Sequence, residues 1–252
     1  MTPPGMPVFD FHARLAPRPG ALDRLYEVLD RCRIDRAAVA AGGTIGLLEL
    51  SRQLVTGEHV ESDADNDNVL AACASSGGRL VPVYFANPHR PIADYRKRAD
   101  DFRALEISPA VHGVPLRDNR VTALVTVAAD AGHSVYLVCL DRDGCQVADL
   151  VALARRFPAV TFVLGHSGIG NIDYYAVELI APQPNIMLET SGGYTTVLSA
   201  ALDRLGSSRV LFGTEFPLQD PLVELAKYQA LGLPDAAWQQ VAWDNASRLL
   251  RA

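Results

Sequence analysis

Polar side chains stand at alternate positions in the first apolar segment of the chain. Residues 8–15 read VFDFHARL, so Asp10, His12 and Arg14 are each two residues apart. In a β-strand, side chains two residues apart share a face, so this spacing predicts that all three point the same way. A carboxylate, an imidazole and a guanidinium on one face could bind a metal ion, transfer a proton or hold an anion.

Residues of the same chemical types occur at the ends of later apolar segments. Imidazole nitrogens and carboxylate oxygens suit zinc and similar divalent ions, so two histidines with carboxylates nearby predict a metal site. Taken singly, such a histidine more often packs or forms hydrogen bonds. His112 lies in a predicted loop and suits substrate contact and loop bracing equally. The strand-end residues are Asn87, Glu106, Ser108, His166, Glu189, Thr190 and Glu215.

Eight short aliphatic or β-branched segments must position these residues, and amphipathic stretches separate them. Several segments are apolar on both faces, which is typical of strands covered by helices. Eight strand-then-helix units predict a (β/α)8 TIM barrel, in which the strand ends meet at one mouth; an open doubly wound sheet is the alternative. No strand is followed by a G-x-G-x-x-G or Walker motif, so a nucleotide site has no support. The predicted strands are 7–12, 36–41, 80–86, 104–108, 134–140, 160–166, 185–190 and 209–214.

Length and composition narrow the class of protein. The 252 residues contain no Ser/Gly-rich or charged linker, so we expect one domain, 1–252. The net charge of −6 disfavours nucleic acid as a partner and favours a small-molecule substrate. No signal peptide or apolar run of about 18 residues is recognisable, so we expect a cytoplasmic protein outside the membrane, with a homodimer possible. The four cysteines show neither zinc-module spacing nor a disulfide framework.

Single residues outside the strand ends carry further expectations. Cys139 should point away from Val138, toward the helices, and so behave as a buried apolar side chain. His59 and His133 should be surface groups. The acidic stretch before residue 65 should lead into a helix that begins near Asp65.

Five segments, in order along nearly the whole chain, resemble motifs of the amidohydrolase superfamily. FDFHARL resembles the D-x-H-x-H motif of strand one, and ISPAVHGVPLRD resembles the H-P-x-x-H-G-x-P-L-D loop after strand four. VLGHSGIG is similar to the strand-six histidine segment, LFGTEFPLQDP to L-F-G-S-D-F-P of strand eight, and WDNASRLL to the closing N-A-x-R-L-L. The resemblance is to the amidohydrolase-related group, which also holds decarboxylases and lactonases. It implies a distorted (β/α)8 barrel with its site at the C-terminal mouth.

The departures from the family pattern alter the metal site that the resemblance implies. Arg14 occupies the place of the second histidine, Glu106 that of a common lysine, Val138 that of the strand-five histidine, and Glu215 that of an aspartate. Arginine has no lone pair for a metal and valine has no ligand atom, so a two-metal centre is not expected. At most one divalent ion is expected, zinc by preference. The residues that could hold it are His12, His166 and Glu215, with Asp10 or Glu106 as a fourth ligand.

Three functions remain open at this stage. The first is a hydrolase of a small anionic amide, ester or lactone, in which Glu215 ligates the metal or accepts a proton. The second is a metal-independent lactonase, decarboxylase or other lyase that uses His166 and Glu215 as acid and base. The third is a non-catalytic relative that binds a ligand or partner. Arg14 should pair with a carboxylate of the protein or of the substrate. The expected substrate-binding residues are Arg14, Asn87, Glu106 and His112.

Overall fold

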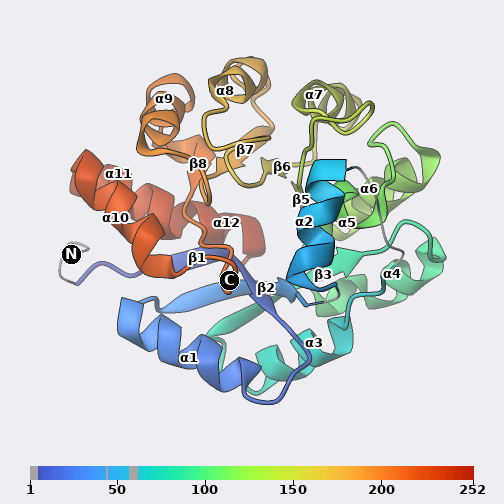
Figure 1. Ribbon diagram of the computed structural model, residues 1–252, viewed down its shortest axis with the longest axis horizontal. Coiled ribbons are helices and arrows are strands. Elements are labelled where there is room, and N and C mark those ends of the chain that lie inside the picture. The colour runs from blue at the N-terminus through green and yellow to red at the C-terminus, as the bar shows by residue number, and fades with distance from the viewer. Residues whose placement is uncertain (1–4, 44, 57–61) are drawn as a thin grey trace.

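The computed structural model describes residues 5–43, 45–56 and 62–252, and its strands follow one another around a barrel in sequence order. All seven neighbouring strand pairs in this sheet are parallel. Helices surround the strands on all sides in Figure 1, which confirms the predicted (β/α)8 barrel. The strands are β1 (Phe9–Leu15), β2 (Arg36–Ala41), β3 (Leu80–Ala86), β4 (Ala104–Ile107), β5 (Ser134–Leu137), β6 (Phe162–Leu164), β7 (Ile186–Glu189) and β8 (Val210–Leu211).

Backbone hydrogen bonds join the first strand to the segment at and after β8. The Phe11 amide donates to the Phe212 carbonyl at 2.9 Å, and the Glu215 amide donates to the His12 carbonyl at 2.9 Å. This closure places the end of β1 directly beside Glu215.

The helices are α1 (Ala21–Cys32), α2 (Leu47–Thr56), α3 (Asn66–Ala74), α4 (Ile92–Arg98), α5 (Pro109–His112), α6 (Asn119–Ala131), α7 (Val147–Arg156), α8 (Tyr174–Ile180), α9 (Thr195–Leu205), α10 (Pro221–Leu231), α11 (Asp235–Gln239) and α12 (Asn245–Leu250), with short helical turns η1 (Ala99–Asp101), η2 (Ser207–Arg209) and η3 (Gln240–Asp244).

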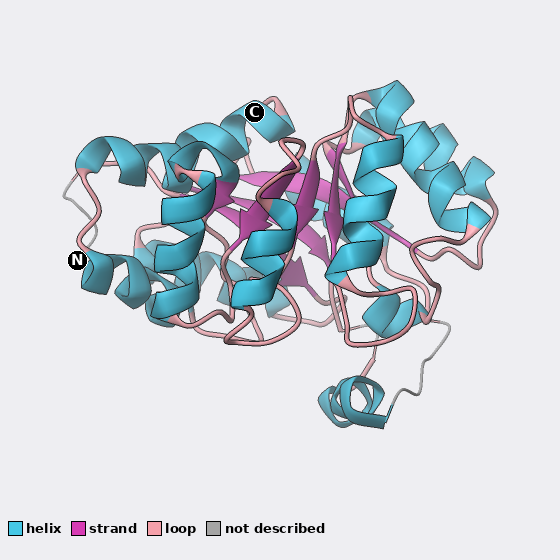
Figure 2. Cartoon of the chain, turned by 90° about the horizontal axis from the view of Figure 1, so that it is seen from above, coloured by secondary structure: helices cyan, strands magenta, loops and turns pink. Residues whose placement is uncertain are grey.

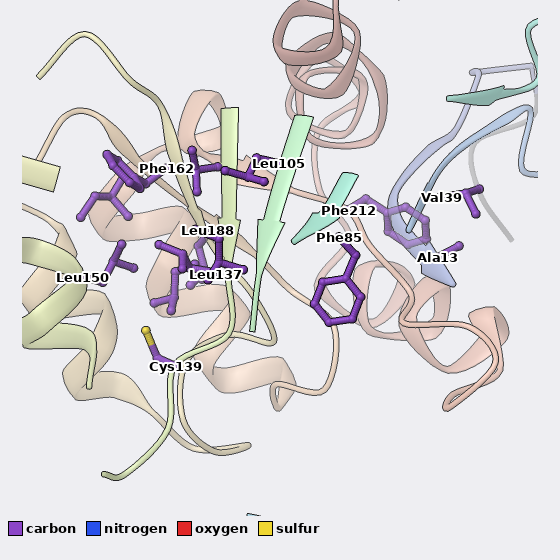
Figure 3. Packing of buried hydrophobic residues seen from close by; sticks show 14 of the residues in the cluster. Ala13, Val39, Phe85, Leu105, Leu137, Cys139, Leu150, Phe162, Leu188 and Phe212 are labelled. Atoms are coloured by element: carbon purple, nitrogen blue, oxygen red, sulfur yellow. The ribbon is translucent and has the colours of Figure 1, made fainter. Parts of the chain in front are cut away.

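Apolar side chains fill two layers, one inside the barrel and one between its strands and helices. Figure 3 shows part of the outer layer, in which Cys139 packs with Leu137 and Leu150. Tyr136 and Val138 belong to the inner layer, as the alternation of side chains along β5 requires. Cys139 is therefore buried toward the helices, as predicted, and burial raises the pKa of its thiol.

A β-bulge in β1 separates Asp10 from the other two polar residues of the strand. The register against β2 shifts between Asp10 and Ala13. Before the shift the odd-numbered residues of β1 pack inside the barrel, and after it the odd-numbered residues pack outside. The prediction that Asp10, His12 and Arg14 share one face is therefore wrong for Asp10, because an extra residue reverses the alternation.

The carboxylate of Asp10 instead ties β1 to the segment after β8. It accepts hydrogen bonds from the amide of Thr214 at 3.0 Å, from the hydroxyl of Thr214 at 2.5 Å and from the amide of His12 at 3.0 Å. Burial raises the pKa of Asp10 to about 6, although these hydrogen bonds oppose the shift. Asp10 thus stabilises the closure of the barrel beneath the site.

Helix α2 lies over the C-terminal mouth in front of α5 (Figure 1), and Figure 2 shows it standing off the body of the barrel. The side chain of Arg142, after β5, donates to the Gln53 carbonyl oxygen and so ties α2 to the loop after β5. Leu48 and Val55 of α2 are exposed. No helix among the described residues is long and apolar enough to cross a membrane.

Two of the remaining expectations can be compared with the structure. Helix α3 begins after Asp65, whose carboxylate accepts a hydrogen bond from the Asn68 amide at 2.9 Å, as the predicted helix start requires. His133 is buried against the Tyr95 hydroxyl at 2.7 Å, so the prediction of a surface group is wrong. His59 lies outside the described residues.

Candidate active site

Four charged side chains form one ion-pair network at the C-terminal mouth. Arg14 donates from Nε to Glu215 Oε1 and from Nη2 to Glu106 Oε1, each at 2.7 Å. Its third nitrogen, Nη1, lies 3.3 Å from the Ala41 carbonyl oxygen. His12 lies between the same carboxylates, with Nε2 3.2 Å from Glu106 Oε2 and Nδ1 in close contact with Glu215 Oε2. The expected pairing of Arg14 with protein carboxylates is present, and it engages two of the three guanidinium nitrogens.

The charges of this network depend on one another because its members are almost entirely removed from water. Burial opposes the charged form of His12, but Glu215 and Glu106 outweigh burial and raise the pKa of His12 to about 10. Burial would raise the pKa of each carboxylate, but Arg14 and His12 hold the pKa of Glu106 and of Glu215 below the ordinary value. At neutral pH the network therefore holds two positive and two negative charges.

His166 follows β6 in a strained turn and faces the network across the mouth. The φ angle is +57° at His166, +59° at Ser167 and +54° at Glu215, in the left-handed region that disfavours side chains with a Cβ. The His166 amide donates to Glu189 Oε2 at 3.1 Å and the Ser167 amide donates to the Glu189 carbonyl at 2.9 Å. These bonds hold the turn so that His166 Nε2 lies 3.7 Å from Glu215 Oε2.

One group of potential metal ligands results from this geometry. His12, His166 and Glu215 each offer one ligand atom, and the three atoms lie within 4.8 Å of one another. His12 Nδ1 and Glu215 Oε2 are buried, face each other and make no well-formed hydrogen bond, so both are available to an ion. Two nitrogens and a carboxylate oxygen suit divalent ions such as zinc and manganese. Within the described residues no second group of this kind occurs.

The fit of a metal ion carries one chemical condition. His12 is protonated at neutral pH, because its pKa is raised to about 10. An imidazolium has no lone pair, so His12 must release a proton before it can ligate an ion. The residues present thus fit one divalent ion, provided that the ion displaces this proton.

A cavity of about 840 Å³ adjoins the network. Its volume lies in the range of small-molecule sites, and Arg14, His166 and Glu215 all line it. Arg18 and Arg24 line the same cavity. The mouth is therefore an open pocket, although the charged side chains at its base pair with one another. The apolar lining residues include Ile45, Leu47, Leu50, Leu54, Phe85, Val111, Val138 and Leu218.

Three of the predicted substrate-binding residues do not reach this cavity. Asn87 donates to Asp63 Oδ1 at 2.8 Å and lines a separate cavity of about 360 Å³. His112 is buried and its Nε2 donates to the Ser62 carbonyl at 3.0 Å, so it braces the loop. Glu106 is fully buried in the ion-pair network and is not among the described residues that line the cavity. Asn87, after β3, and His112, after β4, therefore use their polar groups for hydrogen bonds within the protein.

Tyr136 and Ser191 take part in the site, although sequence reasoning did not single them out. The Tyr136 ring stacks on His12 with centroids 4.1 Å apart, and its hydroxyl donates to Glu189 Oε2 at 2.8 Å. The Ser191 hydroxyl lies 2.9 Å from His166 Nδ1. Ser191 follows a strand-end carboxylate in the sequence, which is a usable signal; Tyr136, inside an apolar run, offers none besides its alternation with Val138.

Comparison with known proteins gives a family and a set of similar folds. A family model described as amidohydrolase matches residues 9–252. No curated protein matches the chain. The 5-carboxyvanillate decarboxylase of Sphingomonas paucimobilis is 14% identical, with a TM-score of 0.74 over 98% of this chain and 99% of that one.

Two further solved structures extend this comparison. The 5-carboxyvanillate decarboxylase of Novosphingobium aromaticivorans, complexed with manganese and 4-hydroxy-3-methoxy-5-nitrobenzoic acid, is 15% identical, with a TM-score of 0.76 over 98% of this chain and 97% of that one. A Pseudomonas putida protein proposed to be a 2-pyrone-4,6-dicarboxylic acid hydrolase is 17% identical, with a TM-score of 0.72 over 98% of each chain. At these identities the likeness establishes the barrel.

Proposed function

Because the chain belongs to the amidohydrolase family, we propose that it is a hydrolase that uses one divalent cation, zinc or manganese, on a small anionic ester, amide or lactone. The observation that supports this most strongly is the convergence of His12, His166 and Glu215 beside a cavity of small-molecule size. Two of the three converging atoms, His12 Nδ1 and Glu215 Oε2, are buried against each other with no other hydrogen-bond partner among the described residues, so an ion that displaces the His12 proton would find both as ligands.

In this proposal His12, His166 and Glu215 hold the cation, and Glu215 also accepts the proton of the attacking water. When bound, a cation supplies a Lewis acid that polarises the carbonyl and acidifies water. Arg14 and His12 keep the pKa of Glu215 well below its ordinary value, so Glu215 is a weak base toward ordinary water. A carboxylate of this kind is effective only toward acidified water, and this favours the cation-assisted reaction over the metal-independent one.

Arg14 is a positioning residue in this scheme. Its Nε holds Glu215 Oε1 at 2.7 Å, which leaves Oε2 facing His12 and His166. Because Glu215, Glu106 and the Ala41 carbonyl already engage its three nitrogens, Arg14 is not assigned the main contact with the substrate anion. That contact is assigned to Arg18 and Arg24, which line the same cavity.

Decarboxylation of an aromatic acid is the second candidate. Two of the similar structures are named as decarboxylases, one of them with manganese and a nitrobenzoic acid. An aromatic ring with a carboxylate would also suit a cavity that combines apolar residues with arginines. Product analysis separates the two candidates, because hydrolysis adds water to give an acid with an alcohol or amine, or one hydroxy acid from a lactone, whereas decarboxylation releases CO2.

Metal content tests the proposal first. Protein stripped with chelator, reloaded with zinc or manganese and desalted should hold about one equivalent by elemental analysis, and His166→Ala should hold less than about a tenth. Asp10→Asn is the matched control, because Asp10 bonds Thr214 instead of joining the ligand group; it should load like the wild type. Wild-type protein that retains no ion would reject the cation-assisted reaction.

Turnover tests it second. Loaded wild type should hydrolyse members of a panel of carboxylate-bearing esters, amides and lactones, and Glu215→Gln should reduce kcat by about 100-fold or more. CO2 release from hydroxybenzoic acids, without hydrolysis of the panel, would instead assign the chain to the decarboxylases. A protein that binds these acids tightly and turns over neither class would be a non-catalytic relative.

A further inference from the structure

A second hydrogen-bond chain lies behind His166, on the side away from Glu215. His166 Nδ1 lies 2.9 Å from the Ser191 hydroxyl, and that hydroxyl donates to Glu189 Oε2 at 2.9 Å. Glu189 is fully buried at the end of β7, and Ser191 is also buried. The chain therefore connects the strand-six histidine to an inner carboxylate that does not itself touch the cavity.

The carboxylate of Glu189 can only accept hydrogen bonds in this environment. It has four donors: the amides of His166 and Ser191 and the hydroxyls of Tyr136 and Ser191. Four converging donors leave no acceptor for a carboxyl hydrogen, so Glu189 is a carboxylate. Because the Ser191 hydroxyl has one hydrogen and gives it to Glu189, it can only accept from His166.

We propose that Ser191, oriented by Glu189, is a positioning residue that holds His166 with its hydrogen on Nδ1. The lone pair of the imidazole then resides on Nε2, the nitrogen that lies 3.7 Å from Glu215 Oε2. In the opposite tautomer Nε2 carries a hydrogen and can neither ligate a cation nor accept a proton. The use of this lone pair to hold a cation rests on the proposed function. The position of the hydrogen on His166 rests only on the direction of the Ser191 and Glu189 hydrogen bonds.

The surroundings of Glu189 are shaped to keep this chain in place. A Cβ on Gly213 would lie 2.4 Å from Glu189 Oε1, and one on Gly165 would lie 2.3 Å from the Tyr136 hydroxyl. Both backbone segments therefore approach the carboxylate and its phenol donor as closely as glycine permits. With these neighbours fixed, the orientation of Glu189, and through it that of Ser191, is set by packing as well as by hydrogen bonds.

The tautomer can be read directly in metal-free protein. Two-bond ¹H–¹⁵N correlation spectra of histidine-labelled protein at pH 9, with His166 assigned by His166→Gln, should show hydrogen on Nδ1 and a bare Nε2. Tyr136→Phe removes a donor to Glu189 but not the Ser191–His166 bond, so it should keep this pattern. Ser191→Ala should lose the preference.

The outcomes decide the inference even where one variant fails to fold. Hydrogen on Nε2 in the wild type, both nitrogens protonated at pH 9, or a Ser191→Ala spectrum unchanged from wild type would each overturn it. The proposed function is tested separately: if the wild type binds zinc, Ser191→Ala should weaken zinc binding by about 10- to 100-fold. If the wild type binds neither zinc nor manganese, the proposed function fails while the spectra still decide the tautomer.

Discussion

Replacement of Arg14 by methionine tests the ion-pair network most directly. Methionine keeps an unbranched apolar stem but removes both 2.7 Å hydrogen bonds, to Glu215 and to Glu106. Glu106 is fully buried and the Glu215 side chain is 11% exposed, so water cannot replace the lost guanidinium. His12 alone would then face two buried carboxylates.

The magnitude follows from the burial of these groups. Removing one partner of a buried ion pair costs about 3–5 kcal/mol, and the retained His12 keeps the loss within this range although two carboxylates are affected. Glu106→Gln in the Arg14→Met background removes one uncompensated charge, so the double variant should recover about 1–3 kcal/mol relative to the sum of the single changes.

The pH dependence has a defined sign. In the wild type the pKa of Glu106 is lowered, so its contribution to stability is present above the ordinary value of 4.5 and is lost as pH falls through the folded-state value. Without Arg14, burial should raise the pKa of Glu106 above 4.5, so stability should instead fall as pH rises. The destabilisation by Arg14→Met should therefore be larger at pH 8 than at pH 5.

Urea unfolding followed by circular dichroism measures these free energies. Arg204→Met is the matched control, since Arg204 makes a two-pronged pair with Glu178 in which both side chains are more than half exposed. Its unfolding midpoint should stay close to that of the wild type. A loss below about 1 kcal/mol for Arg14→Met, equal at both pH values, would refute the conclusion that the buried carboxylates depend on Arg14.

Three other predictions concern separate parts of the molecule. Burial raises the pKa of Glu224 to about 7, so its contribution to stability is full below pH 4.5 and is lost as pH rises through 7. Glu224→Gln should remove up to about 3 kcal/mol of this pH dependence, measured by urea unfolding at pH 4.5 and 8. Arg18→Gln with Arg24→Gln should raise KM for an anionic substrate about tenfold with little change in kcat; an equal KM would show that the anion binds elsewhere. Gly213→Ala, whose Cβ would lie 2.4 Å from Glu189 Oε1, should lower the unfolding free energy by about 1–3 kcal/mol.

The barrel was predictable because its pattern is repeated eight times. Each strand segment is short, apolar and followed by an amphipathic stretch, so an error at one strand does not change the topology. The strand ends were less predictable: residues 134–140 were expected to be one strand, whereas β5 ends at Leu137, and 209–214 contains only Val210–Leu211 as strand. Beyond these points the backbone bonds partners outside the neighbouring strands, since the Leu140 amide donates to the Cys145 carbonyl and the Phe212 amide to the Val241 carbonyl. Apolar patterning does not record that change.

The site was predictable in its members but not in their contacts. His12, His166 and Glu215 meet as expected, because strand ends of a parallel barrel converge. The displacement of Asp10 was not predictable, since a bulge of one residue in β1 has no composition signal in this sequence. The position of Asn87 was not predictable either, because its partner Asp63 lies 24 residues away in the chain.

The charge of the network suggests that cation and anion bind together. Without an ion, Arg14 and protonated His12 balance Glu106 and Glu215. A divalent ion that displaces the His12 proton would leave a net charge of about +1 in a buried place, which is costly until an anion arrives. Zinc should therefore bind more tightly in the presence of an anionic ligand, by about 5- to 100-fold, and by linkage the ligand should bind more tightly with zinc.

This coupling can be measured with a ligand of one of the similar structures. Competition against a chelating dye gives the zinc affinity with and without 4-hydroxy-3-methoxy-5-nitrobenzoate, the anion of the acid bound in the manganese decarboxylase complex. The same titration with 1,2-dimethoxy-3-nitrobenzene, which lacks both the carboxylate and the ionisable phenol, is the control for ring binding and should show no coupling. Equal zinc affinities with and without the acid would mean that zinc binding does not leave an excess positive charge in the cavity. A group other than Arg14, His12, Glu106 and Glu215 would then have to compensate the charge of the ion.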